Sequence, residues 1–203
     1  MANEYLTRTP TSQGNRKVWT WSGWVKRNTL YTSNAGPYLF DAGSSGSQFG
    51  GIRFLSDTSN CLDYNNYPGS TTQAIRSQPV YRDVGSWMHV LISINTTSNT
   101  ASDRLKMYVN GSRVTDFRSS TYPSINDATS FINSTNTHYI GRSTESSYRY
   151  LDGEMFDVFL VDGQALTPDV FGFYKDGDGY ISSGNTNATD FRPGQWMPHS
   201  PTK

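Results

Sequence analysis

Two carboxylates, Glu154 and Asp157, come nearest to catalytic chemistry in this chain. Glycoside hydrolases place two carboxyl groups roughly 5 to 9 Å apart across the bond that they cleave. Residues 153–161 alternate like a β-strand, so a spacing of three predicts that the two carboxylates point to opposite faces. The only other glutamates are Glu4 and Glu145. We therefore predict that the protein is not an enzyme, and that Asp157 hydrogen-bonds inside the sheet.

The histidines and the single cysteine suggest no second reaction centre. His89, His138 and His199 are spread along the chain, and no nucleophile-elbow motif accompanies them. We expect a structural role for His89, which lies in a strongly patterned strand. Cys61 stands alone, so it can form neither an intrachain disulfide nor a cysteine-based metal site. We expect it to pack as a small, half-buried hydrophobic residue.

An acidic segment near the C-terminus resembles the start of a calcium loop. Asp176 and Asp178 alternate with glycines in the sequence DGDGYI. A complete EF-hand loop needs an acidic residue at its twelfth position, and Asn187 stands there. Two alternatives remain: a flexible acidic turn, or a weak calcium site built from Asp176 and Asp178. No other cofactor is expected.

Aromatic residues give the best prediction of a binding site. The chain contains 13 tyrosines, and several fall between the apolar segments. Sugar rings stack on exposed aromatic faces, while asparagine, aspartate and arginine supply hydrogen bonds. Two clusters have this composition, and they comprise Tyr64, Asn65, Asn66 and Tyr67, and Tyr148, Arg149 and Tyr150. The alternative is that these tyrosines pack over sheet edges or at subunit contacts, where tyrosine is enriched.

The elements that must position these residues are short strands. Residues 17–27 predict a strand with Trp19, Trp21 and Val25 on one face. Residues 87–95 predict another, with an apolar face on alternate positions. Asn110-Gly111 predicts a type I′ hairpin turn, because both central residues of that turn need positive φ. Thr167-Pro168 predicts the start of a short helical turn.

The remaining patterns complete an all-β fold. Further strands are expected at residues 38–41, 51–55, 62–64, 72–76, 104–110, 113–117, 138–142 and 153–161. About ten short strands without a long helix predict a two-sheet antiparallel β-sandwich of the jelly-roll type. We expect three parts: an N-terminal arm (1–16), the jelly roll (17–172) and an extended C-terminal tail (173–203). The terminal arms either contact neighbouring subunits or are disordered.

Charge and composition restrict the partners. The chain has 203 residues, with 17 Lys and Arg against 17 Asp and Glu. A net charge of zero gives no field that would attract nucleic acid or an anionic membrane. The first ten residues, MANEYLTRTP, lack the apolar core of a signal peptide, so we expect synthesis in the cytosol.

Three segments, in order, give the chain a resemblance to a known family. They are TWSGWVKR at 20–27, DVGSWMHVLISIN with RLKMYVNG within 83–111, and IGR at 140–142 followed by residues 153–171. Together they resemble laminin G-like, or concanavalin A-like, jelly-roll domains. The resemblance implies a protein that binds rather than catalyses, and it allows for calcium at a loop rim.

The finer pattern resembles stand-alone laminin G-like proteins of tailed bacteriophages. The opening YLTRTPTSQGNRKVWTWSGWVKR, the middle DRLKMYVNG and the ending VFLVDGQALTP carry this likeness. It implies a virion-surface protein: a capsid decoration, a head fibre or a tail adhesin. We expect capsid decoration, because no heptad segment supplies the stem of an adhesin. The alternatives are a carbohydrate-binding tail adhesin and, from another class, a glycan-cleaving enzyme. The implied partners are capsid or tail proteins, further copies of the chain and host-surface glycans.

Overall fold

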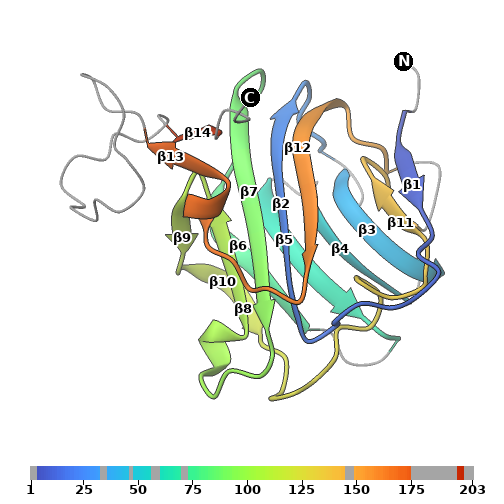
Figure 1. Cartoon of the computed structure of the whole chain (residues 1–203). Coiled ribbons are helices and arrows are strands. Elements are labelled where there is room, and N and C mark those ends of the chain that lie inside the picture. Colours follow the sequence, from blue (N-terminus) through green and yellow to red (C-terminus); the bar gives the residue numbers. More distant parts are fainter. Residues whose placement is uncertain are drawn as a thin grey trace, which may run out of the picture.

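The fold is a β-sandwich of two antiparallel sheets, which confirms the predicted fold class (Figure 1). The computed structural model describes residues 4–32, 36–45, 48–55, 60–69, 73–144, 149–174 and 196–198. The larger sheet has seven strands in the order β1-β11-β3-β4-β5-β6-β10, and the smaller has five in the order β12-β2-β7-β8-β9. The two sheets face each other, and the core fills the space between them.

The strands are short, as the frequent turn-forming residues in the sequence predict. Those of the larger sheet are β1 (Leu6–Arg8), β3 (Tyr38–Ser45), β4 (Gln48–Phe54), β5 (Cys61–Tyr67), β6 (Gln73–Val80), β10 (Phe117–Thr121) and β11 (His138–Ile140). Those of the smaller sheet are β2 (Val18–Arg27), β7 (Trp87–Asn95), β8 (Leu105–Val109), β9 (Ser112–Val114) and β12 (Gly153–Asp162). The other elements are two 3-10 turns, η1 (Ala101–Asp103) and η2 (Pro168–Val170), and the pair β13 (Gly172–Tyr174) and β14 (Trp196–Pro198).

β2 contributes the largest side chains of the core. Trp19 and Trp21 are both 0% exposed, and Val25 packs in the same cluster, as the alternation predicts. Burying each such side chain stabilises the fold by about 1.5–3 kcal/mol. The indole Nε1 of Trp19 donates to Thr129 Oγ1 at 3.0 Å, so this buried donor is satisfied.

The β8–β9 hairpin has the predicted turn. Asn110 and Gly111 have φ values of 47° and 76°, which the type I′ turn requires. The Asn110 Oδ1 also accepts a hydrogen bond from the His89 backbone N at 2.8 Å. The turn therefore holds the beginning of β7 as well as its own two strands, β8 and β9.

β12 departs from the predicted alternation. The pairing with β2 shifts register between Phe156 and Phe159, and Asp157 sits in this bulge with φ 49°. The extra residue resets the pleat. The β12 side chains that pack against the core are Met155, Val158 and Leu160. We predicted that Glu154 and Asp157 point to opposite faces because the strand alternates. The bulge at Asp157 interrupts that alternation between the two residues.

Glu154 and Asp157, the two candidate catalytic carboxylates on β12, are not buried. Asp157 is exposed, so the prediction that it hydrogen-bonds inside the sheet is wrong. Glu154 is exposed as well, and its Oε1 pairs with Lys26 Nζ at 2.7 Å.

The segment expected to be an N-terminal arm contains a strand. β1 lies within residues 1–16 and pairs with β11 in the register Leu6↔Ile140 to Arg8↔His138. Further along, Asn15 N donates to Asp162 Oδ1 at 2.7 Å. These contacts attach the segment to both sheets. Of the expected tail at 173–203, only residues 173–174 and 196–198 are among those described.

The chain after β12 crosses the outer face of the smaller sheet. Thr20 Oγ1 donates to Gln164 O and accepts from Leu166 N, both at 2.8 Å. η2 follows Thr167 with proline at its first position, which confirms the predicted helical turn. No helix within the described part of the chain is long and apolar enough to cross a membrane.

Candidate functional site

A row of polar side chains crosses the outer face of the larger sheet. Tyr38, Arg53, Asp63 and Arg76 are cross-strand neighbours on β3, β4, β5 and β6. Asp63 is 0% exposed, and its two oxygens accept from Arg53 Nε at 2.9 Å and Arg76 Nε at 3.1 Å. Arg53 Nη1 also donates to Tyr38 Oη at 2.9 Å. Each buried charge in this row has a partner, so these side chains form a rigid support for a ligand bound on the outer face.

Gly51 lets an aromatic ring lie close against this sheet. An ideal Cβ at Gly51 would lie 2.6 Å from Tyr38 Cε1 and 2.8 Å from Asp41 Oδ1. Any side chain there would displace the ring. The Tyr38 ring reaches Phe49, with centroids 6.2 Å apart. The glycine therefore sets the aromatic arrangement of this face.

Asp41 is a buried carboxyl group beside that ring. It is 1% exposed, and its Oδ2 accepts from Thr144 N at 2.6 Å. Its Oδ1 has no hydrogen-bond partner among the described residues. Burial raises the pKa of Asp41 to about 7, since desolvation disfavours the carboxylate.

The structure connects the two aromatic clusters predicted from sequence. The Arg149 guanidinium lies 6.0 Å from the Tyr38 ring, and Phe49 lies 6.0 Å from the Tyr67 ring. With the contact between Tyr38 and Phe49, these groups form a continuous series across the outer face. Tyr67 and Arg149 are half-buried, so part of each reaches the surface.

Tyr64 is a correction to the predicted site. It is 1% exposed, lies in the core and packs on Trp19 with centroids 6.1 Å apart. Its pKa is raised well above the usual range by burial. A ring enclosed in this way cannot stack on a sugar. The reason is the period of β5, because Tyr64 alternates with Asp63 and points to the inner face.

Asn65 and Asn66 are also strand residues rather than loop residues. They are 5% and 1% exposed. Asn66 Oδ1 accepts from Ser130 N at 2.9 Å, so its amide fixes the fold. Asn65 Nδ2 donates to Asp63 Oδ2 at 3.2 Å and supports the polar row. Both side chains are buried and bonded within the protein, although Asn65 Oδ1 has no partner among the described residues. Contact of either residue with a glycan stays a prediction.

A cluster of three tyrosines surrounds Arg142 next to β11. The guanidinium carbon lies 4.6 Å from the Tyr5 ring, 5.1 Å from Tyr139 and 5.7 Å from Tyr150. Tyr150 belongs to the predicted site. Sequence reasoning missed Tyr5, Tyr139 and Arg142, because it assigned Tyr5 to an arm, Tyr139 to a strand and Arg142 to the fold signature. Their convergence depends on the pairing of β1 with β11, which no local pattern indicates.

The metal prediction falls outside what the structure describes. Asp176 and Asp178 are not among the described residues, and neither is Tyr148. Within the described ranges, no group of three or more His, Cys, Asp and Glu residues could hold a metal ion. A calcium site at Asp176 and Asp178 stays a prediction.

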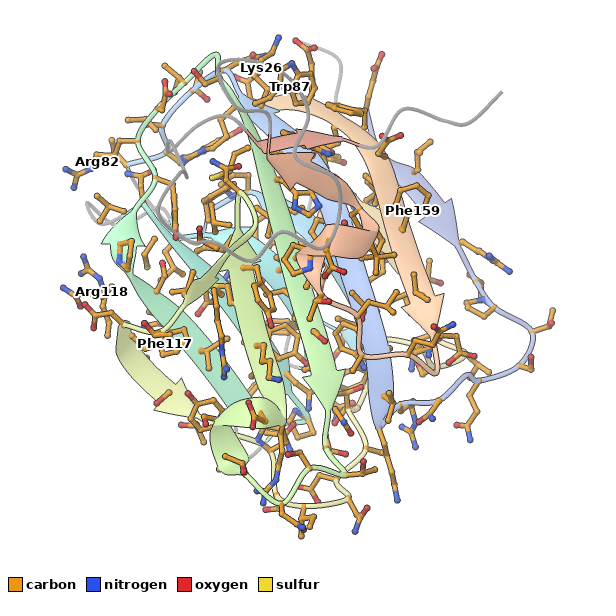
Figure 2. The ribbon with its side chains drawn as sticks, turned by 60° about the vertical axis from the view of Figure 1, so that its left-hand side comes forward. Lys26, Arg82, Trp87, Phe117, Arg118 and Phe159 are labelled. Atoms are coloured by element: carbon orange, nitrogen blue, oxygen red, sulfur yellow. The ribbon has the colours of Figure 1, made fainter. Side chains whose placement is uncertain are left out.

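A second aromatic surface lies on the smaller sheet (Figure 2). Trp87 is 39% exposed and packs edge-on against Phe156, with centroids 4.7 Å apart. Lys26 Nζ lies 5.3 Å from the Trp87 ring, and Figure 2 places the two labels together at one end of the sheet. Sequence reasoning treated this tryptophan as part of the fold signature only.

His89 has a structural position. It is 0% exposed, and its Nε2 lies 2.8 Å from Ser22 Oγ. Desolvation lowers its pKa to about 4, so the ring is neutral at physiological pH. Neutral and enclosed, His89 cannot exchange protons with a bound substrate.

Residues 2–170 match the concanavalin A-like lectin/glucanases superfamily. The match spans most of the chain, so the protein belongs to this superfamily. No curated protein sequence matches the chain.

Several solved structures share the fold at low sequence identity. A heptameric SAP-like pentraxin from Limulus polyphemus is 19% identical, with a TM-score of 0.53 over 80% of this chain and 71% of that one. Domain 4 of AbnA, a GH43 arabinanase from Geobacillus stearothermophilus solved with arabinotriose, is 18% identical, with a TM-score of 0.54 over 83% and 71%. The Ruminococcus gnavus IT-sialidase CBM40 bound to α2,3-sialyllactose is 13% identical, with a TM-score of 0.51 over 84% and 96%. These likenesses show a fold shared with lectins and carbohydrate-binding modules.

Proposed function

We propose that this protein binds glycans without cleaving them, and that the sugar lies on the outer face of the larger sheet. One observation carries the proposal: Tyr67, Phe49 and Arg149, all half-buried, reach the surface of that face around the buried Tyr38 ring, which contacts Phe49 and Arg149. Aromatic faces accept the apolar side of a sugar ring, and guanidinium groups donate to its hydroxyls.

The rigid base beneath these groups favours binding. Arg53, Asp63 and Tyr38 already hold one another, so little side-chain entropy is lost when a ligand arrives. The structures solved with arabinotriose and sialyllactose share the fold, which supports the sugar-binding proposal without identifying a sugar.

The absence of catalysis is part of the proposal. Glu154 is engaged with Lys26 at 2.7 Å, and His89 is buried and neutral. Neither group is placed to act as a general acid. Incubation with β-glucans is expected to release no reducing ends. Release that disappears in Glu154→Gln would instead favour the glycoside hydrolase alternative.

A glycan array with point variants tests the binding site. We expect Tyr67→Ala and Arg149→Ala to weaken binding by about 10-fold or more, as loss of stacking or of a charged hydrogen bond does. Arg118→Ala is the matched control, since Arg118 is exposed on the edge strand β10 and projects away from the sheet (Figure 2). A purified, folded protein that binds no glycan on the array would contradict the proposed function.

We further propose that the protein is carried on the surface of a bacteriophage particle, most simply as a capsid decoration. The proposal is supported by the resemblance of the opening, middle and ending segments to laminin G-like phage proteins. Its partners would be capsid proteins and further copies of the chain, with host-surface glycans bound outward. The alternative is a receptor-binding tail adhesin.

Antibody labelling of purified particles separates these locations. Gold on the head would support decoration, and gold only on the tail would support the adhesin. Sedimentation of the purified protein tests the predicted homo-oligomer separately. A monomer at all concentrations would contradict that part.

A further inference from the structure

We propose that Arg142, held by Tyr5, Tyr139 and Tyr150, recognises a carboxylate, so that the preferred glycans carry an acidic sugar such as a uronic or sialic acid. This inference rests on the proposed function and specifies its ligand class. It concerns the tyrosine cluster described above, at the β1–β11 end of the same outer face.

Among the described residues, the guanidinium of Arg142 has donors without an acceptor. Its Nε donates to the Ser143 carbonyl at 3.1 Å. No described residue accepts a hydrogen bond from its Nη1 or Nη2, and no described carboxylate lies within 4.0 Å of it. Arg53 and Arg76 differ, because both are bound to Asp63. Nη1 and Nη2 of Arg142 can therefore donate two parallel hydrogen bonds to a carboxylate.

The tyrosine rings fix the direction of that guanidinium. Tyr5 and Tyr150 pack on each other with centroids 5.8 Å apart, and Tyr5 packs on Tyr139 at 6.3 Å. An arginine stacked on aromatic rings has already lost side-chain freedom, so less is lost when it binds. Within the described structure, the three phenol hydroxyls make no hydrogen bond to a side chain, so they remain able to bond a carboxylate or a sugar hydroxyl.

The charges on the face favour an anion. Asp63 is neutralised by two arginines, and Asp41 is largely protonated below neutral pH because burial raises its pKa to about 7. Arg142 and Arg149 are two cations near the tyrosine cluster. Glu4, exposed next to Tyr5, opposes them. The two guanidinium groups attract an anion locally, although the net charge of the chain is zero.

Matched ligand pairs test the inference by calorimetric titration of the full chain. The probes are trigalacturonate against its carboxyl-reduced form, and α2,3-sialyllactose against lactose. We expect at least one acidic member to bind about 10- to 100-fold more tightly than its neutral partner, and this preference to shrink as NaCl rises. Glu4→Gln is expected to increase the preference.

Two arginine substitutions locate the preference. Arg142→Gln is expected to remove it, while leaving binding of the neutral partner within about 2-fold, since that partner has no carboxylate to pair with the guanidinium. Arg142→Lys is expected to restore only part, because an ammonium lacks the planar fork. Arg118→Gln is the control for loss of one positive charge. Thermal unfolding of each variant checks that it is folded.

The outcomes distinguish failure of the acidic-sugar inference from failure of the proposed function. Equal affinity for acidic and neutral partners overturns the inference but leaves the proposed function standing. An acidic preference that survives in Arg142→Gln also overturns it. Failure to bind any of the four probes or any glycan on the array overturns both the proposed function and the inference.

Discussion

A single buried carboxyl group makes the stability of this protein depend on pH. The Asp41 carboxyl has a pKa of about 7 in the fold against 3.8 in an unfolded chain, because burial disfavours its charged form. The folded state therefore binds the proton more tightly. Its contribution to stability is complete below about pH 4 and is lost as pH rises through 7.

We predict that Asp41→Asn removes this pH dependence. Asparagine keeps an oxygen that can accept from Thr144 N but carries no charge. At pH 8 the variant should be more stable by up to about 4 kcal/mol, and at pH 4 the two proteins should be alike. Urea unfolding at several pH values measures the difference. A constant difference between the two proteins from pH 4 to 8 would contradict the assignment.

Two buried tyrosines predict opposite effects of the same substitution. The Tyr64 hydroxyl is buried without a hydrogen-bond partner among the described residues, whereas the Tyr38 hydroxyl accepts from Arg53 Nη1 at 2.9 Å. We expect Tyr64→Phe to stabilise the protein by about 1 kcal/mol and Tyr38→Phe to destabilise it by about 1 kcal/mol. Chemical denaturation compares the pair. Tyr64→Phe should leave glycan binding unchanged, because its ring lies in the core; a loss of binding would argue against that placement.

At the scale of elements, β1 decides whether the first residues belong to the domain. Its three residues pair with β11 and bring Tyr5 to Arg142. We predict that deleting residues 1–9 lowers the free energy of unfolding by about 1–2 kcal/mol, comparable with uncovering one apolar side chain. The deletion should also weaken binding of acidic glycans. A detached arm would be removed without either effect, so unchanged unfolding would contradict the pairing.

The elements that sequence predicted well are those with a strong local signal. β2 and β7 alternate cleanly, and Asn110-Gly111 requires its turn. β12 was misjudged at one position, because the positive φ of Asp157 resets the pleat and aspartate also tolerates ordinary strand geometry. Nothing local distinguishes the two conformations.

The site was harder to predict than the fold, because its residues meet only through pairing. Asn65-Asn66 has the composition of a turn, yet both lie inside β5, and Asn66 is held there by Ser130, far along the chain. Arg142 and Tyr5 are separated by most of the chain and join through β1 and β11. Composition indicated a surface rich in tyrosine and arginine, but the choice among those residues depended on strand register.

At the scale of the whole molecule, the segment that follows β12 packs against the sandwich. The segment 163–171 covers the outer face of the smaller sheet, where Thr20 is 0% exposed and bonds Gln164 and Leu166. Phe171 packs beside His89, with ring centroids 6.3 Å apart. The superfamily match ends in the same region, at residue 170.

Two truncations test the predicted domain boundary near residue 172. Ending the chain after Asp162 strips the two hydrogen bonds of Thr20 and uncovers His89, so we expect a loss of about 3 kcal/mol or more. Ending it after Tyr174 keeps these contacts, and we expect stability within about 0.5 kcal/mol of the full chain. Denaturant unfolding measures both, and the glycan array reports whether the opposite sheet still binds. If the longer truncation product unfolds as readily as the shorter one, residues beyond 174 belong to the folding unit, and the predicted boundary near residue 172 is wrong. If instead only binding to virus particles is lost, the C-terminal residues serve attachment, as the capsid proposal requires.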